Sequence, residues 1–107
     1  MIALCMIALA IAIALHCADW LQTRWISSQG ALNGIHETNK ILGPHPSLRQ
    51  VDMYFAIALV GLLIIVMAAY HLEGWIGLVL AALWAGVELY FVVRNRRLGI
   101  GFYFGKT

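Results

Sequence analysis

Acidic residues in apolar surroundings are the first candidates for chemistry in this sequence. Glu88 lies inside an uncharged apolar run that ends at Arg94, and Asp19 lies near the end of an earlier apolar run. An unpaired carboxylate in hydrocarbon costs about 3 kcal/mol on insertion scales, so such a group is protonated, paired or used. Glu88 therefore indicates an ion or proton site, a general acid, or a structural bond to a loop amide, to Arg24 or to Arg94. The structural bond is the interpretation that we favour.

Histidines offer a second set of candidates. His16 precedes Asp19 by three residues, so their side chains can hydrogen-bond on one face of a helix. A general base oriented by a carboxylate has this spacing, and so does a satisfied polar patch. His36, Glu37 and His45 lie in a polar stretch, but none are spaced i, i+4 as in the zinc motif H-E-x-x-H. The sequence predicts no metal site and no cofactor.

The composition places these residues in a membrane. Of 107 residues, 63% are hydrophobic and 11% are charged. Soluble domains carry about a quarter charged residues, and a small domain leaves too much surface exposed to hide so much apolar area. The expected partner is therefore the lipid bilayer.

Three apolar runs predict three membrane-spanning helices, over about residues 2–24, 48–72 and 75–95, because a span needs about 20 apolar residues. Residues 25–47 are expected to form a loop, and Ser47 opens a capping box, S-x-x-Q, for the second helix. The turn at 72–74 is so short that the third helix must return antiparallel. Residues 98–107 are expected to form an interfacial tail. The predicted fold is one all-α domain, 1–107, an integral membrane three-helix bundle.

Small residues recur at helical spacing on two of the predicted spans. Such residues let membrane helices approach closely. We expect these positions to be packing surfaces, and because three spans leave some of them unused, we expect a homo-oligomer or a membrane-protein complex. They are Ala8 and Ala12 in the first span and Gly77, Ala81 and Ala85 in the third.

The positive charges are segregated. All seven Lys and Arg residues lie at the adjoining ends of the first two helices, in the loop between them, or at and after the end of the third. The positive-inside rule then predicts the N-terminus outside, the C-terminus inside and a cytoplasmic loop folded over the helix ends, in the bacterial inner membrane. Arg94, Arg96 and Arg97 are expected to bind anionic lipid headgroups, and no nucleic acid is expected as a partner.

Several short motifs carry a resemblance. They are Asp19-Trp20-Leu21-Gln22-Thr23, Glu37-Thr38-Asn39-Lys40-Ile41-Leu42-Gly43, Pro46-Ser47, Glu88, and Asn95 with Gly99-Ile100. Together they resemble a group of small bacterial and phage-associated multi-pass membrane proteins whose loop reads E-T-N-P-I/L-L-G-x-H-P-S. This chain departs from that pattern at Lys40, which replaces the proline. The resemblance implies one polar cluster of Asp19, Gln22, Thr23, Glu37, Asn39, Ser47, Glu88 and Asn95.

These patterns favour a non-enzymatic function, which is assembly of the chain with itself or with a larger membrane complex. The resemblance suggests a phage or prophage setting, such as lysis or host-membrane modification. One alternative is a small intramembrane enzyme acting on a lipid or peptide, with Glu37, Asp19 and Glu88 as acid–base residues. A second alternative is a proton or ion pathway in an oligomer.

Overall fold

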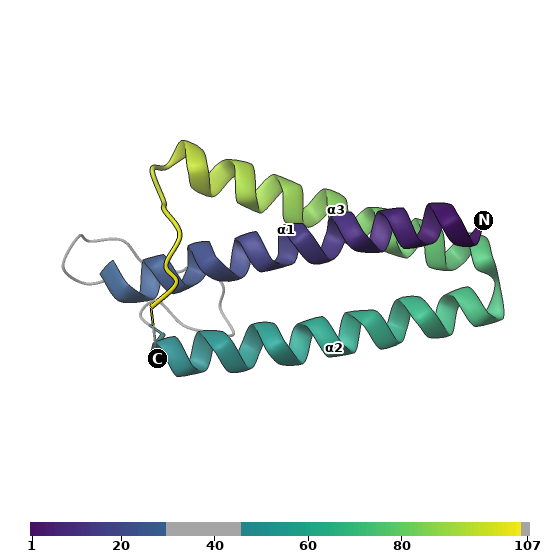
Figure 1. The fold of residues 1–107 in the computed structure, drawn as a ribbon, viewed down its shortest axis with the longest axis horizontal. Helices are drawn as coiled ribbons and strands as arrows, with labels where there is room; N and C mark the ends of the chain where they lie inside the picture. Colours follow the sequence, from purple (N-terminus) through teal and green to yellow (C-terminus); the bar gives the residue numbers. More distant parts are fainter. Residues whose placement is uncertain (30–45, 106–107) are drawn as a thin grey trace.

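The computed structural model describes residues 1–29 and 46–105, and this part of the chain contains three long helices (Figure 1). They are α1, Ile2–Gln29; α2, Leu48–Leu72; and α3, Gly74–Arg97. All three are long and apolar enough to cross a membrane. The prediction of an all-helical, multi-pass membrane protein is confirmed.

The start of α2 has the predicted capping box. The Ser47 hydroxyl accepts a hydrogen bond from the Gln50 backbone N–H at 3.1 Å, and the Gln50 side-chain oxygen accepts one from the Ser47 N–H at 2.9 Å. These bonds satisfy donors that have no partner within the helix. The helix therefore begins at Leu48, where the sequence predicted it.

The connection between α2 and α3 is a single extended residue. Glu73 has φ −156° and ψ 113°, and its N–H donates to the Ala69 carbonyl at 2.9 Å. The chain reverses there, so α3 runs back beside α2, as predicted (Figure 1). Gly77 then lies directly against Tyr70, which is possible because glycine has no side chain.

The first helix is longer than predicted. The sequence placed its end near residue 24, with a loop from 25, but α1 continues to Gln29. Two serines in the added turns bond to carbonyl groups: Ser28 donates to Trp25 O at 2.8 Å and Ser27 to Pro46 O at 2.6 Å. A serine that bonds back along its own helix does not end it, and the bond to Pro46 ties this end of α1 to the start of α2.

The tail after α3 crosses over α1 (Figure 1). Gly99 has φ +82°, a left-handed conformation that favours glycine, and it turns the chain back. Ile100 is buried, and the Tyr103 N–H donates to the Leu21 carbonyl at 3.2 Å. Among the residues predicted to form an interfacial tail, Ile100 and Tyr103 thus tie the segment to the bundle, whereas Leu98 and Phe104 are exposed.

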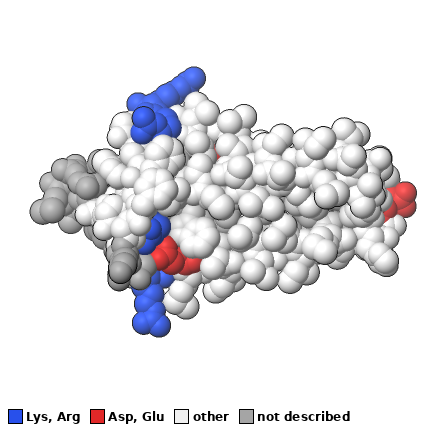
Figure 2. Space-filling model, in the orientation of Figure 1, with Lys and Arg blue, Asp and Glu red and all other residues white. Residues whose placement is uncertain are grey.

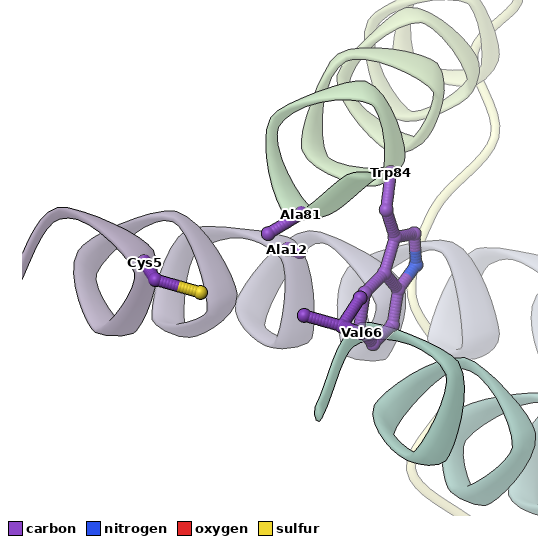
Figure 3. Close-up of a cluster of buried hydrophobic side chains, with 5 residues drawn as sticks. All are labelled: Cys5, Ala12, Val66, Ala81 and Trp84. Atoms are coloured by element: carbon purple, nitrogen blue, oxygen red, sulfur yellow. The ribbon is translucent and has the colours of Figure 1, made fainter. Parts of the chain in front are cut away.

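A small apolar core joins all three helices (Figure 3). Ala12 of α1 and Ala81 of α3 are fully buried and adjacent, so the two backbones approach closely. Val66 of α2 and Trp84 of α3 fill the space beside them, and Cys5 completes the cluster. Among the other predicted packing residues, Ala8 and Ala85 are partly buried against this cluster.

The charged groups lie mainly at one end of the bundle (Figure 2). This end, called the charged end below, is formed by the C-terminal parts of α1 and α3, the N-terminal part of α2, and the tail. The opposite end holds the Glu73 turn and the N-terminus, because Met1 lies beside Gly74. Between the two ends, the face seen in Figure 2 carries almost no charged residue.

Candidate functional site

His16 is the centre of a buried polar group. Its side chain is 2% exposed, and its Nε2 lies 3.0 Å from the backbone carbonyl of Phe55. The rings of Phe55, Trp84 and Trp20 surround the imidazole, at centroid distances of 5.2, 5.8 and 6.4 Å. A carbonyl oxygen only accepts hydrogen bonds, so Nε2 carries a hydrogen and donates it.

Glu88 faces the other ring nitrogen. Its Oε1 lies 3.7 Å from His16 Nδ1, and Glu88 itself is 9% exposed. This distance is too long for a hydrogen bond, so the contact is electrostatic. Within the described residues, His16 Nδ1, Glu88 Oε2 and Trp84 Nε1 are buried without a hydrogen-bond partner.

The Phe55 carbonyl limits the positions at which this pair can carry protons. Because Nε2 keeps its hydrogen, a further proton taken up by the pair would lie either on His16 Nδ1 or on the Glu88 carboxyl. The pair is then an imidazolium with a carboxylate, or a neutral imidazole with a carboxylic acid. Both states have zero net charge, which is the arrangement that makes two ionisable groups tolerable in hydrocarbon.

Two sequence-based interpretations need correction here. Within the described residues, Glu88 contacts His16 rather than Arg24 or Arg94, and His16 does not bond to Asp19 because its two nitrogens face Phe55 and Glu88. Helix spacing identifies neighbours only within one helix. The parallel course of α1 and α3, which brings His16 and Glu88 together, is a property of the tertiary structure.

A second group joins α1, α2 and the tail. Asp52 Oδ1 accepts a hydrogen bond from Trp20 Nε1 at 2.8 Å and lies 3.0 Å from Arg24 Nε. The other nitrogens of Arg24 donate to the carbonyls of Tyr103 and Gly105. The Arg24 guanidinium therefore holds the tail and α2 against α1.

Trp20 links the two groups. Its ring is stacked on Phe55, with centroids 6.0 Å apart and planes 14° apart, and the Phe55 carbonyl receives His16. The sequence-predicted cluster omitted His16, Trp20, Arg24 and Asp52. The sequence does indicate the Arg24–Asp52 pair, because these residues carry opposite charges near the same end of two antiparallel spans.

A third group joins α1 to α3. Gln22 is fully buried, and its amide N–H donates to the Val92 carbonyl at 3.1 Å. The Asn95 amide donates to Gln22 Oε1 at 3.1 Å. Gln22 uses both its donor and its acceptor, so its amide orientation is fixed. The structure thus brings together two members of the predicted cluster.

The remaining predicted residues are more dispersed. Thr23 is buried and donates to the Asp19 carbonyl at 2.9 Å, within its own helix. Ser47 caps α2. Glu37 and Asn39 lie outside the described residues. Among the described members, hydrogen bonds join Gln22 to Asn95 and Thr23 to Asp19, and the prediction of one polar cluster stays a prediction.

Among residues 1–29 and 46–105, no three His, Cys, Asp or Glu side chains are placed to hold a metal ion; His36, Glu37 and His45 lie outside these ranges. An open pocket of about 610 Å³ lies between α1 and α2, and its lining does not include Asp19 or Glu88. It is lined by Cys17, Trp20, Leu21, Arg24, Asp52, Met53 and Ala56.

Comparisons of the chain with protein-family models, with curated proteins and with solved structures returned no match. The site is therefore interpreted from its own geometry.

Proposed function

We propose that the chain is a structural subunit of the bacterial inner membrane, which assembles with itself or with a larger membrane complex. The observation that carries this proposal is the direction of the polar side chains. His16, Gln22 and Arg24 all project from α1 into bonds with other helices or with the tail. The face seen in Figure 2 carries almost no charge between the two ends, and many large hydrophobic side chains are exposed.

Interhelical polar bonds of this kind specify one arrangement of the helices. In hydrocarbon no water can replace a lost partner, so sliding or rotating α1 would leave buried donors and acceptors unsatisfied. The three-helix unit is then a rigid block with lipid-facing surfaces. Gly61 on α2 supports assembly, since a Cβ added there would meet no atom within 4 Å, which leaves room for a helix of another chain.

Assembly is tested by native mass spectrometry from a mild detergent, combined with chemical crosslinking in membranes. We expect a defined oligomer or a retained partner, and we expect Gly61→Leu to shift the population towards the monomer. Ala14→Leu, which adds one carbon atom fewer than Gly61→Leu at an exposed position on α1, is the matched control. A wild-type chain that is monomeric by both methods would contradict the proposal.

The proposal includes an orientation with the charged end in the cytoplasm and the Glu73 turn outside. It is supported by the positive-inside rule and by the clustering of Arg side chains at one end (Figure 2). In a background where Cys5 and Cys17 are replaced by alanine, a Glu73→Cys variant should react with a membrane-impermeant maleimide from the periplasm. Leu98→Cys should react only after permeabilisation, and the reverse result would overturn the orientation.

A second candidate function is an acid–base site at His16 and Glu88. It is favoured by the two buried atoms that have no hydrogen-bond partner in the described part, His16 Nδ1 and Glu88 Oε2. Residues 2–15, 57–70 and 75–86 contain no charged residue and no histidine. About 20 Å of apolar helix therefore separates the pair from the Glu73 turn. This separation favours proton exchange between the pair and the charged end over a proton pathway that crosses the bilayer within one chain.

Infrared difference spectroscopy tests this second function. If the pair exchanges a proton, a carboxyl band should change between two pH values in the wild type and be missing from Glu88→Gln. Asp52→Asn is the control for the other carboxylate. An identical difference spectrum for wild type and Glu88→Gln would exclude the site.

A further inference from the structure

The outer face of α3 carries a groove close to the charged end. Its volume is about 480 Å³, and it is lined by Gly86, Leu89, Tyr90, Val93, Arg94, Arg97 and Leu98. These residues recur every three or four positions, so they lie along one side of the helix. Most are exposed to the surroundings of the bundle rather than to its interior. In a membrane this face contacts lipid.

The groove has an apolar part and a basic end. Gly86 opens the apolar part, since a Cβ added there would meet no atom within 4 Å. From Gly86 to Arg97 the helix rises about 17 Å, close to the roughly 15 Å of hydrocarbon in one leaflet. An acyl chain lying along this face would thus place its headgroup beside the arginines.

The two arginines of the groove differ from the others at the charged end. Arg24 is bound to Asp52 and to the tail, and Arg96 donates to the Ile100 carbonyl at 2.8 Å and lies over the Phe102 ring. Within the described residues, the side chains of Arg94 and Arg97 form no hydrogen bond or ion pair. The groove lining contains no acidic residue, so its basic end is an uncompensated double positive charge.

We propose that this groove binds an anionic phospholipid, with the phosphate between Arg94 and Arg97 and an acyl chain along Gly86, Leu89 and Val93. Guanidinium groups bind phosphate through paired, charge-assisted hydrogen bonds. The apolar wall selects a lipid over a free anion, because only a lipid supplies both the phosphate and the chain. This site is independent of the proposed assembly and distinguishes Arg94 and Arg97 from Arg96.

The test uses the full chain in nanodiscs of phosphatidylcholine with increasing phosphatidylglycerol, with retained lipid counted by native mass spectrometry. We expect preferential retention of phosphatidylglycerol. Arg97→Gln should weaken it about tenfold, the equivalent of one charge-assisted hydrogen bond. Arg49→Gln is the matched control, because Arg49 is an exposed arginine on α2 at the charged end but outside the groove.

Gly86→Leu tests the contribution of the apolar part of the groove separately from that of the arginines. This change fills the apolar part and leaves both arginines, so it should also weaken phosphatidylglycerol retention about tenfold. The proposal is overturned if Arg49→Gln weakens retention as much as Arg97→Gln, if Gly86→Leu has no effect, or if phosphatidylglycerol is not preferred. It is also overturned if inorganic phosphate displaces the lipid. A Gly86→Leu variant that changes the oligomeric state but not phosphatidylglycerol retention would overturn it too, because a second chain would then be the occupant of the groove.

Discussion

Replacing Gly77 with alanine should force α2 and α3 apart. A Cβ at this position would lie 2.6 Å from Tyr70 Cβ, 2.7 Å from its Cα and 2.9 Å from its backbone nitrogen. Ordinary van der Waals contacts are 3.4–4 Å, so the helices must separate by close to an ångström. Two of the three contacts involve the Tyr70 backbone, so a change of rotamer cannot relieve them, and the one-residue turn at Glu73 restricts any shift.

The size of the effect is obtained by comparison with Gly86→Ala on the same helix. Overpacking of this kind costs about 1–3 kcal/mol, whereas glycine to alanine in a helix gains about 1 kcal/mol. A Cβ at Gly86 meets no atom within 4 Å, so that variant shows only the gain. The difference in unfolding free energy between the two variants should therefore be the clash alone, about 1–3 kcal/mol.

The assay is reversible unfolding in mixed micelles with increasing sodium dodecyl sulfate, followed by tryptophan fluorescence. We expect Gly77→Ala to unfold at lower detergent fraction than Gly86→Ala. Equal unfolding free energies for the two variants would refute the close α2–α3 contact.

Three further changes test individual contacts. Ser47→Ala should destabilise the protein by about 1 kcal/mol in the same assay, because it removes the cap of α2; an unchanged unfolding free energy would mean that the cap is not needed. Trp20→Phe keeps the apolar ring but loses the bond to Asp52, and should cost about 0.5–1.5 kcal/mol, while Trp75→Phe, at an exposed position, serves as the control. Glu88→Leu should cost about 1–3 kcal/mol because it removes the carboxyl group that faces His16 Nδ1 at 3.7 Å and leaves that buried nitrogen against hydrocarbon; Glu88→Gln should cost less, since the amide keeps a polar group at this position, and a leucine variant as stable as wild type would remove Glu88 from any structural role.

Much of the fold is readable from local patterns. The length and apolarity of the three runs predict the spans, because a segment's transfer from water to lipid depends mainly on its own composition. The capping box at Ser47 and the turn at Glu73 are equally local, since each involves residues a few positions apart. The segregation of Lys and Arg likewise shows in the sequence which end of the bundle carries the positive charge.

The residues that form the candidate site cannot be predicted from local patterns. The sequence indicates that Glu88 needs a partner, but it does not identify His16, which lies 72 positions away. Their contact depends on the rotation of α1 and α3 about their axes and on the depth at which the helices cross, which the packing of Ala12 against Ala81 sets. These quantities are not encoded in any short stretch of sequence.

The extension of α1 and the path of the tail have the same origin. Local propensity ended α1 near residue 24, but the bond from Ser27 to Pro46 and the packing of Ile26 stabilise the additional helix. The tail is held by Arg24 and by the Leu21 carbonyl, both on α1. The sequence alone determines where the three apolar spans lie and which end is basic. The tertiary structure decides which polar groups meet, because in a bilayer each buried polar group must find its partner on a neighbouring element.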